Sequence, residues 1–470
     1  MFLGCIILIT IIFFILKIPF LSLPYFWDEA WSYIPAVEWM RVHGPGILPG
    51  AIPPELSRGH PLLFYFLASS WQSILVNSVT VTHILPVIIA CAFMLALFLF
   101  IKRFFDEYIA LNTVLLFASM QIFFVQSGLL LPEILMALWA ILVLYSFLTD
   151  RKLLYFILAS MMMLTKESGF VLIAAIFAVK SATLLLDKEQ RSLKRILFQL
   201  TFILSPLIAP FVFFIMQKFR FGWIFFPEHM NKISFNPDNI YLTLSIILKI
   251  IFFNDGRWFM RVIMISSMIY ILIRLRFVIR ERIFIKKEMV PLLYILVFIL
   301  FYIAFCIINF FTDRYLLAIL PLIVFLCVFI FIKLLPNKYL HIPVFAFLLV
   351  LSLCSYFRST GIQDINMNYT DAVKVQKATV YYLEANNYRE KKIWVSYLMS
   401  FNLKDKSLAY LSRGKEFKNL TSVLEDKADA YVTLSFDNDT TTFNPFKREN
   451  KLKLIKTFEK GLAKSEIYIP

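Results

Sequence analysis

The chain has 470 residues, of which 60% are hydrophobic, and its 47 Lys and Arg against 31 Asp and Glu give a net charge of +16. A soluble protein of this length could not bury so many apolar side chains, so the composition excludes a soluble globular protein and predicts a polytopic membrane protein. Many basic residues lie in loops between apolar segments, where they orient a membrane protein and meet anionic lipids; no zinc-finger spacing or basic helix indicates nucleic acid as a partner. All five cysteines lie in apolar segments, so we expect neither disulfides nor thiolate metal sites.

The first predicted span, 1–23, lacks a basic n-region and a small-residue cleavage site, so we expect it to be an uncleaved span rather than a signal peptide. It leads into an aromatic loop, 25–33, that contains Asp28 and Glu29. The two carboxylates therefore lie at a membrane surface, among side chains that settle at headgroup level. They either cap an interfacial helix that begins near Ala30 or carry out chemistry.

Ten further apolar segments are compatible with membrane spans and bring the predicted number to about eleven, give or take two. They cover 83–101, 108–126, 130–149, 152–166, 168–186, 195–217, 258–279, 290–309, 314–335 and 339–357. The strongly basic loops are alternate loops along the chain, so they all lie on one side of the membrane, and the positive-inside rule makes that side cytoplasmic. The acidic pairs and motifs then all face outward, to the periplasm or cell exterior of what we expect to be a bacterial inner or plasma membrane.

Two shorter apolar stretches, 60–76 and 240–253, do not fit this alternation as spans, and we expect them as helices at the outer interface. After residue 357 the composition changes, because 358–470 carries 33 of the 78 charged residues in about a quarter of the chain. In this tail the patterns predict a helix and two short strands, at 369–386, 392–397 and 430–435. The predicted fold is therefore mainly α: a membrane helical bundle, 1–357, followed by a small extracytoplasmic α/β domain, 358–470.

Charged residues at a bilayer are costly and indicate function. Asp28 is the first candidate, because a carboxylate in a water-poor cleft can take a proton from a hydroxyl group. Glu133 follows Pro132 at an outer helix start, where it is either a helix-terminal acid or a second acid of the site. Lys166 lies in a tight outer hairpin and either binds a phosphate as a point charge or snorkels beside Glu167.

Further cations of the outer face are candidate phosphate ligands, namely Arg58, His60, Arg257 and Arg314. A divalent metal is a weaker candidate, because its potential ligands have no fixed spacing and are equally compatible with structural hydrogen bonds. These ligands are His60, Glu228 and His229. The sequence indicates no other cofactor. A carboxylate base and several cations under a soluble domain are what transfer from a lipid-linked phosphate requires.

Several short motifs follow one another in a familiar order. They are Asp28-Glu29 after the first span, His60-Pro61-Leu62-Leu63-Phe64-Tyr65, Leu164-Thr165-Lys166 before Ser168-Gly169, Trp223 to His229, and Arg314-Tyr315-Leu316. Together they resemble motifs of the GT-C glycosyltransferases, most of all the branch that holds the protein O-mannosyltransferases and the lipid A aminoarabinose transferase. The likeness covers about residues 1–335. The tail resembles no family that we can name.

The resemblance implies that Asp28 is the catalytic base and that Glu29 supports it. It also implies that His60 and Lys166 contact the donor phosphate and that Glu133 is a second outer-loop acid. The chain departs from the family pattern in two motifs. It has Gly59-His60 where the aminoarabinose enzymes have Glu-Lys, and it has Leu131-Pro132-Glu133 where that branch usually places an Asp before the proline.

We therefore expect an integral membrane glycosyltransferase that moves a sugar from a polyprenyl-phosphate donor to an extracytoplasmic hydroxyl of a glycan, lipid or protein, with inversion. One alternative is a flippase or transporter of lipid-linked saccharides, which would carry polar residues in mid-span and paired repeats. Another is a polysaccharide polymerase or ligase, which would carry basic clusters in a large late outer loop. The apolar spans and the modestly basic loop 217–257 favour the first interpretation.

Overall fold

The computed structural model describes residues 2–186, 192–253, 286–335, 337–412, 414–424, 427–437 and 440–470, and the single residues 262, 265, 266 and 269. The expected span over 258–279 and the candidate Arg257 lie outside the described residues, apart from these four positions.

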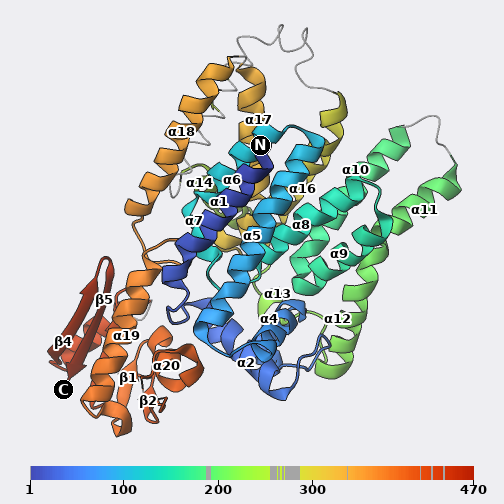
Figure 1. Ribbon diagram of the computed structural model, residues 1–470. Helices are drawn as coiled ribbons and strands as arrows, with labels where there is room; N and C mark the ends of the chain where they lie inside the picture. The colour runs from blue at the N-terminus through green and yellow to red at the C-terminus, as the bar shows by residue number, and fades with distance from the viewer. Residues whose placement is uncertain are drawn as a thin grey trace.

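A bundle of apolar helices forms most of the molecule (Figure 1). In the described ranges six helices are long and apolar enough to cross a membrane: Phe2–Phe20, Val79–Phe104, Glu167–Leu186, Leu193–Phe221, Glu288–Ile308 and Tyr339–Phe357. Four shorter apolar helices accompany them: Glu107–Ala118, Glu133–Leu148, Lys152–Thr165 and Leu320–Leu334. These ten match ten of the expected spans, so the prediction of a mainly helical, polytopic membrane protein is confirmed.

Two central helices are too short to cross the bilayer unaided. α8 (Glu133–Leu148) has 16 residues and α9 (Lys152–Thr165) has 14. At 1.5 Å per residue they reach only about 21–24 Å, against a hydrocarbon thickness of about 30 Å. The basic turn around Asp150 joins them at one end, so the missing length lies at the other end, beside Glu133 and Lys166.

The same end of the bundle contains two further interruptions. The expected span over 108–126 is wrong as a single helix, because it divides at Ser119 into α6 (Glu107–Ala118) and α7 (Gln121–Gln126). The expected span over 314–335 opens with a 3₁₀ segment, η5 (Asp313–Ala318), before α17 (Leu320–Leu334).

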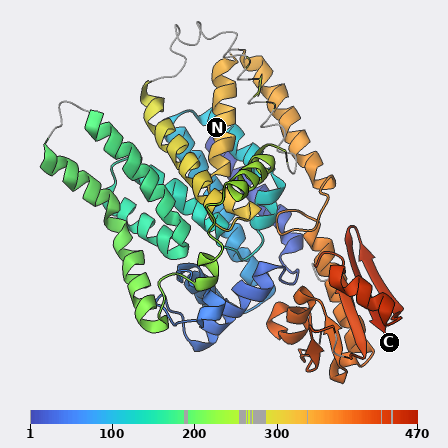
Figure 2. The ribbon, with the colours of Figure 1, turned by 180° about the vertical axis from the view of Figure 1, so that it is seen from behind.

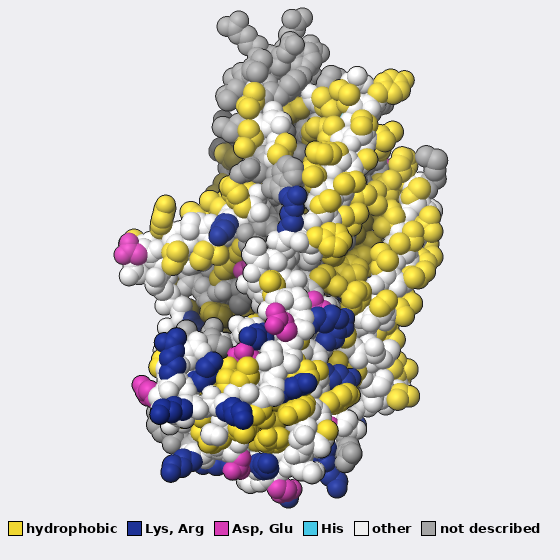
Figure 3. Space-filling view, turned by 90° about the vertical axis from the view of Figure 1, so that its left-hand side faces the viewer, with side chains coloured by type: hydrophobic (Ala, Val, Ile, Leu, Met, Phe, Trp, Pro, Cys, Tyr) yellow, Lys and Arg dark blue, Asp and Glu magenta, His cyan; other side chains and the backbone are white. Residues whose placement is uncertain are grey.

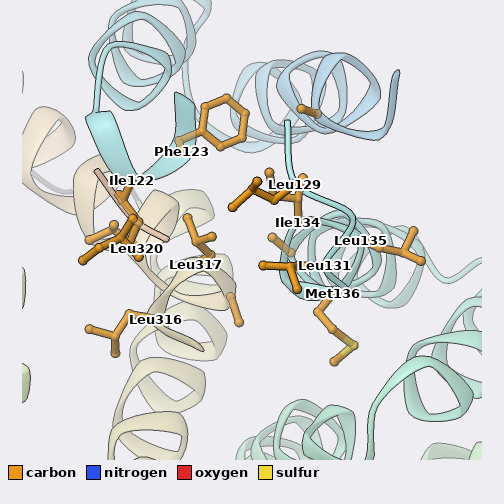
Figure 4. Packing of buried hydrophobic residues seen from close by; sticks show 14 of the residues in the cluster. Ile122, Phe123, Leu129, Leu131, Ile134, Leu135, Met136, Leu316, Leu317 and Leu320 are labelled. Carbon is orange, nitrogen blue, oxygen red and sulfur yellow. The ribbon is translucent and has the colours of Figure 1, made fainter. Parts of the chain in front are cut away.

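Buried leucines behind these interruptions hold the segments together. Figure 4 shows Leu317 of η5 facing Leu129 and Leu131, which precede α8, and Leu320 beside Ile122. Irregular backbone is tolerated at membrane depth only where protein or a cavity surrounds it. The surrounding leucines therefore shield the irregular backbone from lipid, which allows a polar site to lie inside this end of the bundle.

Short helices cover this end of the bundle. They include α2 (Ile34–His43), α3 (Pro54–Ser57), α4 (Leu63–Ile74) and α13 (Pro227–Met230). A further short helix, α14 (Pro237–Phe252), packs on α16 (Lys286–Ile308), and Figures 1 and 2 draw it farther from the tail than α2 and α4. The predicted helices over 60–76 and 240–253 are thus present as α4 and α14. Figures 1 and 2 place α2 and α4 at the same end as the C-terminal tail.

The tail contains one five-stranded sheet with the order β2-β1-β3-β5-β4. β1 pairs in parallel with β2 and β3, whereas β5 runs antiparallel to β3 and β4. The strands are β1 (Ile393–Val395), β2 (Leu420–Thr421), β3 (Ala430–Leu434), β4 (Lys453–Lys460) and β5 (Ala463–Ile469). The helices are α19 (Tyr369–Ala385), which contacts β4 and β5, α20 (Tyr397–Lys404) and α21 (Thr440–Glu449).

The predicted helix and both predicted strands of the tail are confirmed as α19, β1 and β3. The prediction missed the hairpin of β4 and β5, although it turns at Gly461, whose φ of +55° suits glycine. In Figure 3 Lys, Arg, Asp and Glu side chains gather over the lower part of the molecule, where the tail lies, and hydrophobic side chains cover the helices above it.

The tail packs directly on the aromatic loop of the bundle. The Tyr410 hydroxyl lies 2.9 Å from the backbone oxygen of Tyr25. The Phe26 and Tyr369 rings lie 5.8 Å apart. The Gln126 amide donates to the backbone oxygen of Asp364 at 2.6 Å. The chain that leaves the last apolar helix therefore crosses the same region as Asp28.

Candidate active site

The loop that carries Asp28 has unusual backbone geometry. Trp27 has a φ of +52°, a left-handed conformation that is costly for a large side chain. A single π-helical turn, η2 (Glu29–Tyr33), follows Asp28, and such turns occur frequently at functional sites. The Asp28 carboxylate does not cap this turn; its Oδ1 accepts a hydrogen bond from the Trp31 indole at 2.8 Å. The capping interpretation of Asp28 is therefore wrong.

Glu29 points away from Asp28 and is completely buried. Its Oε1 accepts from the Leu130 N–H at 2.7 Å and lies 2.9 Å from His83 Nε2, while its Oε2 accepts from the Phe26 N–H at 3.2 Å. The other ring nitrogen of His83 faces the backbone oxygen of Leu21 at 3.0 Å. Both ring nitrogens of His83 therefore lie within hydrogen-bond distance of an oxygen. Glu29 thus anchors the loop.

We expect Glu29→Ala to destabilise the protein by about 3–5 kcal/mol, because His83 and two backbone N–H groups would lose a buried charged partner. The thermal unfolding midpoint in detergent measures this loss. Asp238→Ala, which removes an exposed acid of α14, is the control and should leave the midpoint unchanged. An unchanged midpoint for Glu29→Ala would show that other contacts hold the loop.

Arg314 is the centre of a buried charge cluster. It lies in η5, and its guanidinium pairs with Asp28, with Asp364 and with Glu133, the last at 3.3 Å. Asp364 belongs to the segment between the last apolar helix and α19, so the tail contributes a carboxylate to the cluster. Burial raises the pKa of Asp364 above its ordinary value, and the Arg314 guanidinium opposes that rise.

Lys166 also belongs to this charge cluster, through its contact with Glu133. Its Nζ lies 3.2 Å from Glu133 Oε1 and 3.7 Å from the centre of the Tyr315 ring. The alternative in which Lys166 pairs with Glu167 is wrong, because Glu167 contacts His60 instead, at 2.9 Å. Two buried cations, Lys166 and Arg314, thus face three carboxylates, so the cluster has a negative formal charge.

The histidines lie beside the cluster without forming a metal centre. The His60 and His229 rings are 5.1 Å apart, but Glu228 is mostly exposed and pairs with Arg58 at 3.3 Å. Throughout the described ranges no three His, Cys, Asp or Glu side chains are grouped to hold a metal ion. Burial lowers the pKa of His229 to about 4, so its ring is neutral at pH 7.

A cavity of about 460 Å³ opens above the cluster. Its lining includes five of the predicted site residues, Asp28, Arg58, His60, His229 and Arg314. Four others do not line it, namely Glu29, Glu133, Lys166 and Glu228. Trp27 and Arg58, both at positive φ, lie on its wall. Their strained backbone thus coincides with the open part of the site.

The lining also includes charged residues that the sequence analysis did not propose for the site, among them Asp364 and Lys232. Asp364 lies just beyond the last span, among the outer-side acids by the same alternation that selected Glu133, and that position was its available signal. Lys232 follows the aromatic-Glu-His motif by three residues, and its Nζ lies 4.4 Å from the centre of the Phe310 ring.

These features define the class of the protein: it is an integral membrane protein with a polar cavity at one end of a helical bundle. Residues 59–214 match the family model for dolichyl-phosphate-mannose-protein mannosyltransferase. The crystal structure of ArnT from Cupriavidus metallidurans bound to undecaprenyl phosphate is similar with a TM-score of 0.60 at 11% identity, over 99% of this chain and 97% of that chain. Its apo structure has a TM-score of 0.59 at 10% identity, with the same coverage.

An oligosaccharyltransferase from Archaeoglobus fulgidus, in its apo form, matches with a TM-score of 0.48 at 15% identity, over 87% of this chain and 64% of that chain. No curated protein matches the sequence significantly. The similarity to the two ArnT structures confirms the expected GT-C fold, and the donor and the acceptor are matters for proposal.

Proposed function

We propose that the protein transfers a sugar from a polyprenyl-phosphate donor to a hydroxyl group on the extracytoplasmic side of the membrane. The observation that carries this proposal is the placement of the Asp28 carboxylate on the wall of a cavity that Arg58 and Lys232 also line. A base and cations facing one space suit an acceptor hydroxyl and a phosphate leaving group. The similarity to ArnT, crystallised with undecaprenyl phosphate, supports a lipid-phosphate donor.

The donor phosphate is assigned to the cations that face the cavity. Arg58 and Lys232 line it, whereas the charges of Lys166 and Arg314 are taken up by Glu133, Asp28 and Asp364. The expected direct phosphate contacts of Lys166 and Arg314 are therefore replaced, in this proposal, by a positioning role.

His60 also faces the donor phosphate in this proposal. Its Nδ1 donates to the Glu167 carboxylate, because a carboxylate can only accept. Its Nε2 has no hydrogen-bond partner in the part of the chain that the structure describes, and the ring lines the cavity. Nε2 can therefore hydrogen-bond to the phosphate or the sugar.

The reaction is a single in-line displacement. Asp28 takes the proton of the acceptor hydroxyl as the acceptor oxygen forms a bond to the anomeric carbon of the sugar. The bond from that carbon to the phosphate oxygen breaks, and polyprenyl phosphate leaves with the electron pair. The acceptor attacks from the side opposite the leaving group, so the configuration at the anomeric carbon inverts. No metal-bound step is needed for this balance.

The direct test is transfer by the purified protein in liposomes from polyprenyl-phosphate sugars labelled in the sugar. A deletion strain identifies the donor, as the polyprenyl-phosphate sugar that accumulates, and the acceptor, as the glycan, lipid or protein that lacks a residue. Release of polyprenyl phosphate together with a glycosylated product supports the proposal. Movement of intact donor across the bilayer without such release would identify a flippase and overturn it.

We expect the cavity and the tail to lie outside the cytoplasm, because the basic loops occupy the opposite ends of the spans. In a cysteine-free background, cysteines placed at exposed Asn231 and Asn386 should react with an impermeant maleimide in intact cells. A cysteine at exposed Lys152, the opposite-side control, should react only after the inner membrane is permeabilised. The reverse pattern would reject both the topology and the lipid-phosphate donor.

A further inference from the structure

A second cavity, of about 550 Å³, lies at the other end of α8 and α9. Glu133 begins α8 and Lys166 follows α9, so the turn that joins these helices is remote from the candidate active site. The cavity lies among this turn, α10 (Phe170–Leu186), α11 (Leu193–Leu204) and α16 (Lys286–Ile308). The proposed glycosyl transfer makes no use of it.

Four cations line this cavity, against one acid, Asp150. They come from three segments, Arg151 and Lys152 from the turn, Lys180 from α10 and Arg195 from α11. Within the described parts of the chain none of the four forms an ion pair, and the Arg151 guanidinium lies 5.6 Å from the centre of the Tyr145 ring. Basic residues that only orient a membrane protein do not have to lie close together. These four cations line the same cavity, so orientation alone does not account for their placement.

Most of the remaining wall is apolar or aromatic, with Ser146 and Gln199 as its uncharged polar residues. It includes Phe147, Phe198, Phe202 and Val290. The Tyr155 hydroxyl donates to the backbone oxygen of Ile203 at 2.9 Å and so joins α9 to α11 beside the cavity. Hydrophobic side chains next to the wall are exposed on the outside of the bundle, among them Leu153, Leu197 and Phe198. The cavity therefore combines a cationic rim with a surface that suits lipid tails.

We propose that this cavity binds the phosphate headgroup of an anionic phospholipid from the leaflet opposite the active site, with an acyl chain along α9 and α11. The four cations surround the phosphate, and the Gln199 amide can donate to a headgroup oxygen. A soluble phosphate compound would use the cations but not the aromatic wall. The proposal does not depend on the proposed reaction.

The test measures lipid binding to the full-length protein by native mass spectrometry, with phosphatidylglycerol, phosphatidylcholine, and glycerol 3-phosphate as the soluble probe. We expect phosphatidylglycerol to bind in preference to phosphatidylcholine. The double variant R151Q/R195Q should bind phosphatidylglycerol roughly 25-fold more weakly, at about fivefold for each cation removed near a headgroup. The pair K152Q/K180Q tests the same rim if the first variant does not fold.

The matched control is R103Q/K194Q, which removes two exposed cations from the same end of the bundle without touching the cavity. It should keep the binding and the preference. An equal loss of binding in the control would show that the lipid responds to the general surface charge, and it would reject the site. Unchanged binding in both cavity variants would also reject the site. Glycerol 3-phosphate that binds as tightly as the phospholipid would reject the lipid assignment.

Discussion

Replacing Asp28 by Asn should reduce sugar transfer by about 10²–10⁴-fold, the usual loss when a general base is removed. The amide keeps the shape of the side chain and an oxygen that can accept from the Trp31 indole. Arg314 would lose one partner but keep Glu133 and Asp364, so the cluster should remain folded. The measurement is the single-turnover rate with saturating donor, at matched protein levels in membranes.

The control for this variant is Asp238→Asn, which removes an exposed carboxylate from α14, outside the cavity lining. It should transfer sugar at the parent rate. Near-normal turnover by Asp28→Asn would exclude Asp28 as the base. Asp364, the partly buried carboxylate on the same cavity with a raised pKa, would then be the next residue to test.

The variants Arg58→Ala and Lys166→Ala should distinguish a residue that binds the donor from a residue that positions the base. Arg58 lies on the cavity wall, where its partner Glu228 is mostly exposed, whereas Lys166 is buried against Glu133. We expect Arg58→Ala to reduce kcat/KM for the donor by roughly 10- to 150-fold, the loss of one charge-assisted contact of about 1.5–3 kcal/mol. The thermal unfolding midpoint should not change.

Lys166→Ala should instead lower kcat and the unfolding midpoint together, because Glu133 would lose one of its two cationic partners in a buried site. Lys166→Arg should restore part of both, since the charge returns with a different geometry. Lys249→Ala, an exposed cation on α14, is the common control.

Either variant can contradict the proposed roles, in which Arg58 binds the donor phosphate and Lys166 positions the base. If Lys166→Ala changes the KM for the donor and leaves the midpoint unchanged, Lys166 contacts the phosphate directly, as the family resemblance implies. If Arg58→Ala behaves like the Lys249 control, the phosphate is held by Lys232 and the histidines alone.

Most of the architecture was predictable from the sequence, because hydropathy is a local property. An apolar segment must be shielded from water wherever it lies, so ten of the expected spans appear as apolar helices. The aromatic loop around Asp28 and the helix α19 were recognisable for the same reason. The interruptions at Ser119 and in η5 were not, because an apolar sequence is compatible with both continuous and broken helices once neighbouring segments shield the backbone.

The grouping of charges was decided by the tertiary structure alone. Arg314 meets Asp28 across 286 residues and Asp364 across 50, and Lys166 pairs with distant Glu133 rather than with adjacent Glu167. The side chains of two adjacent residues at a helix end point in different directions, so adjacency in the sequence does not predict an ion pair. In a buried site every charge needs a partner, and that partner is whichever opposite charge the packed helices bring within reach. The sequence by itself determined the class of protein and its candidate base, and the packing determined which of the cations line the cavity.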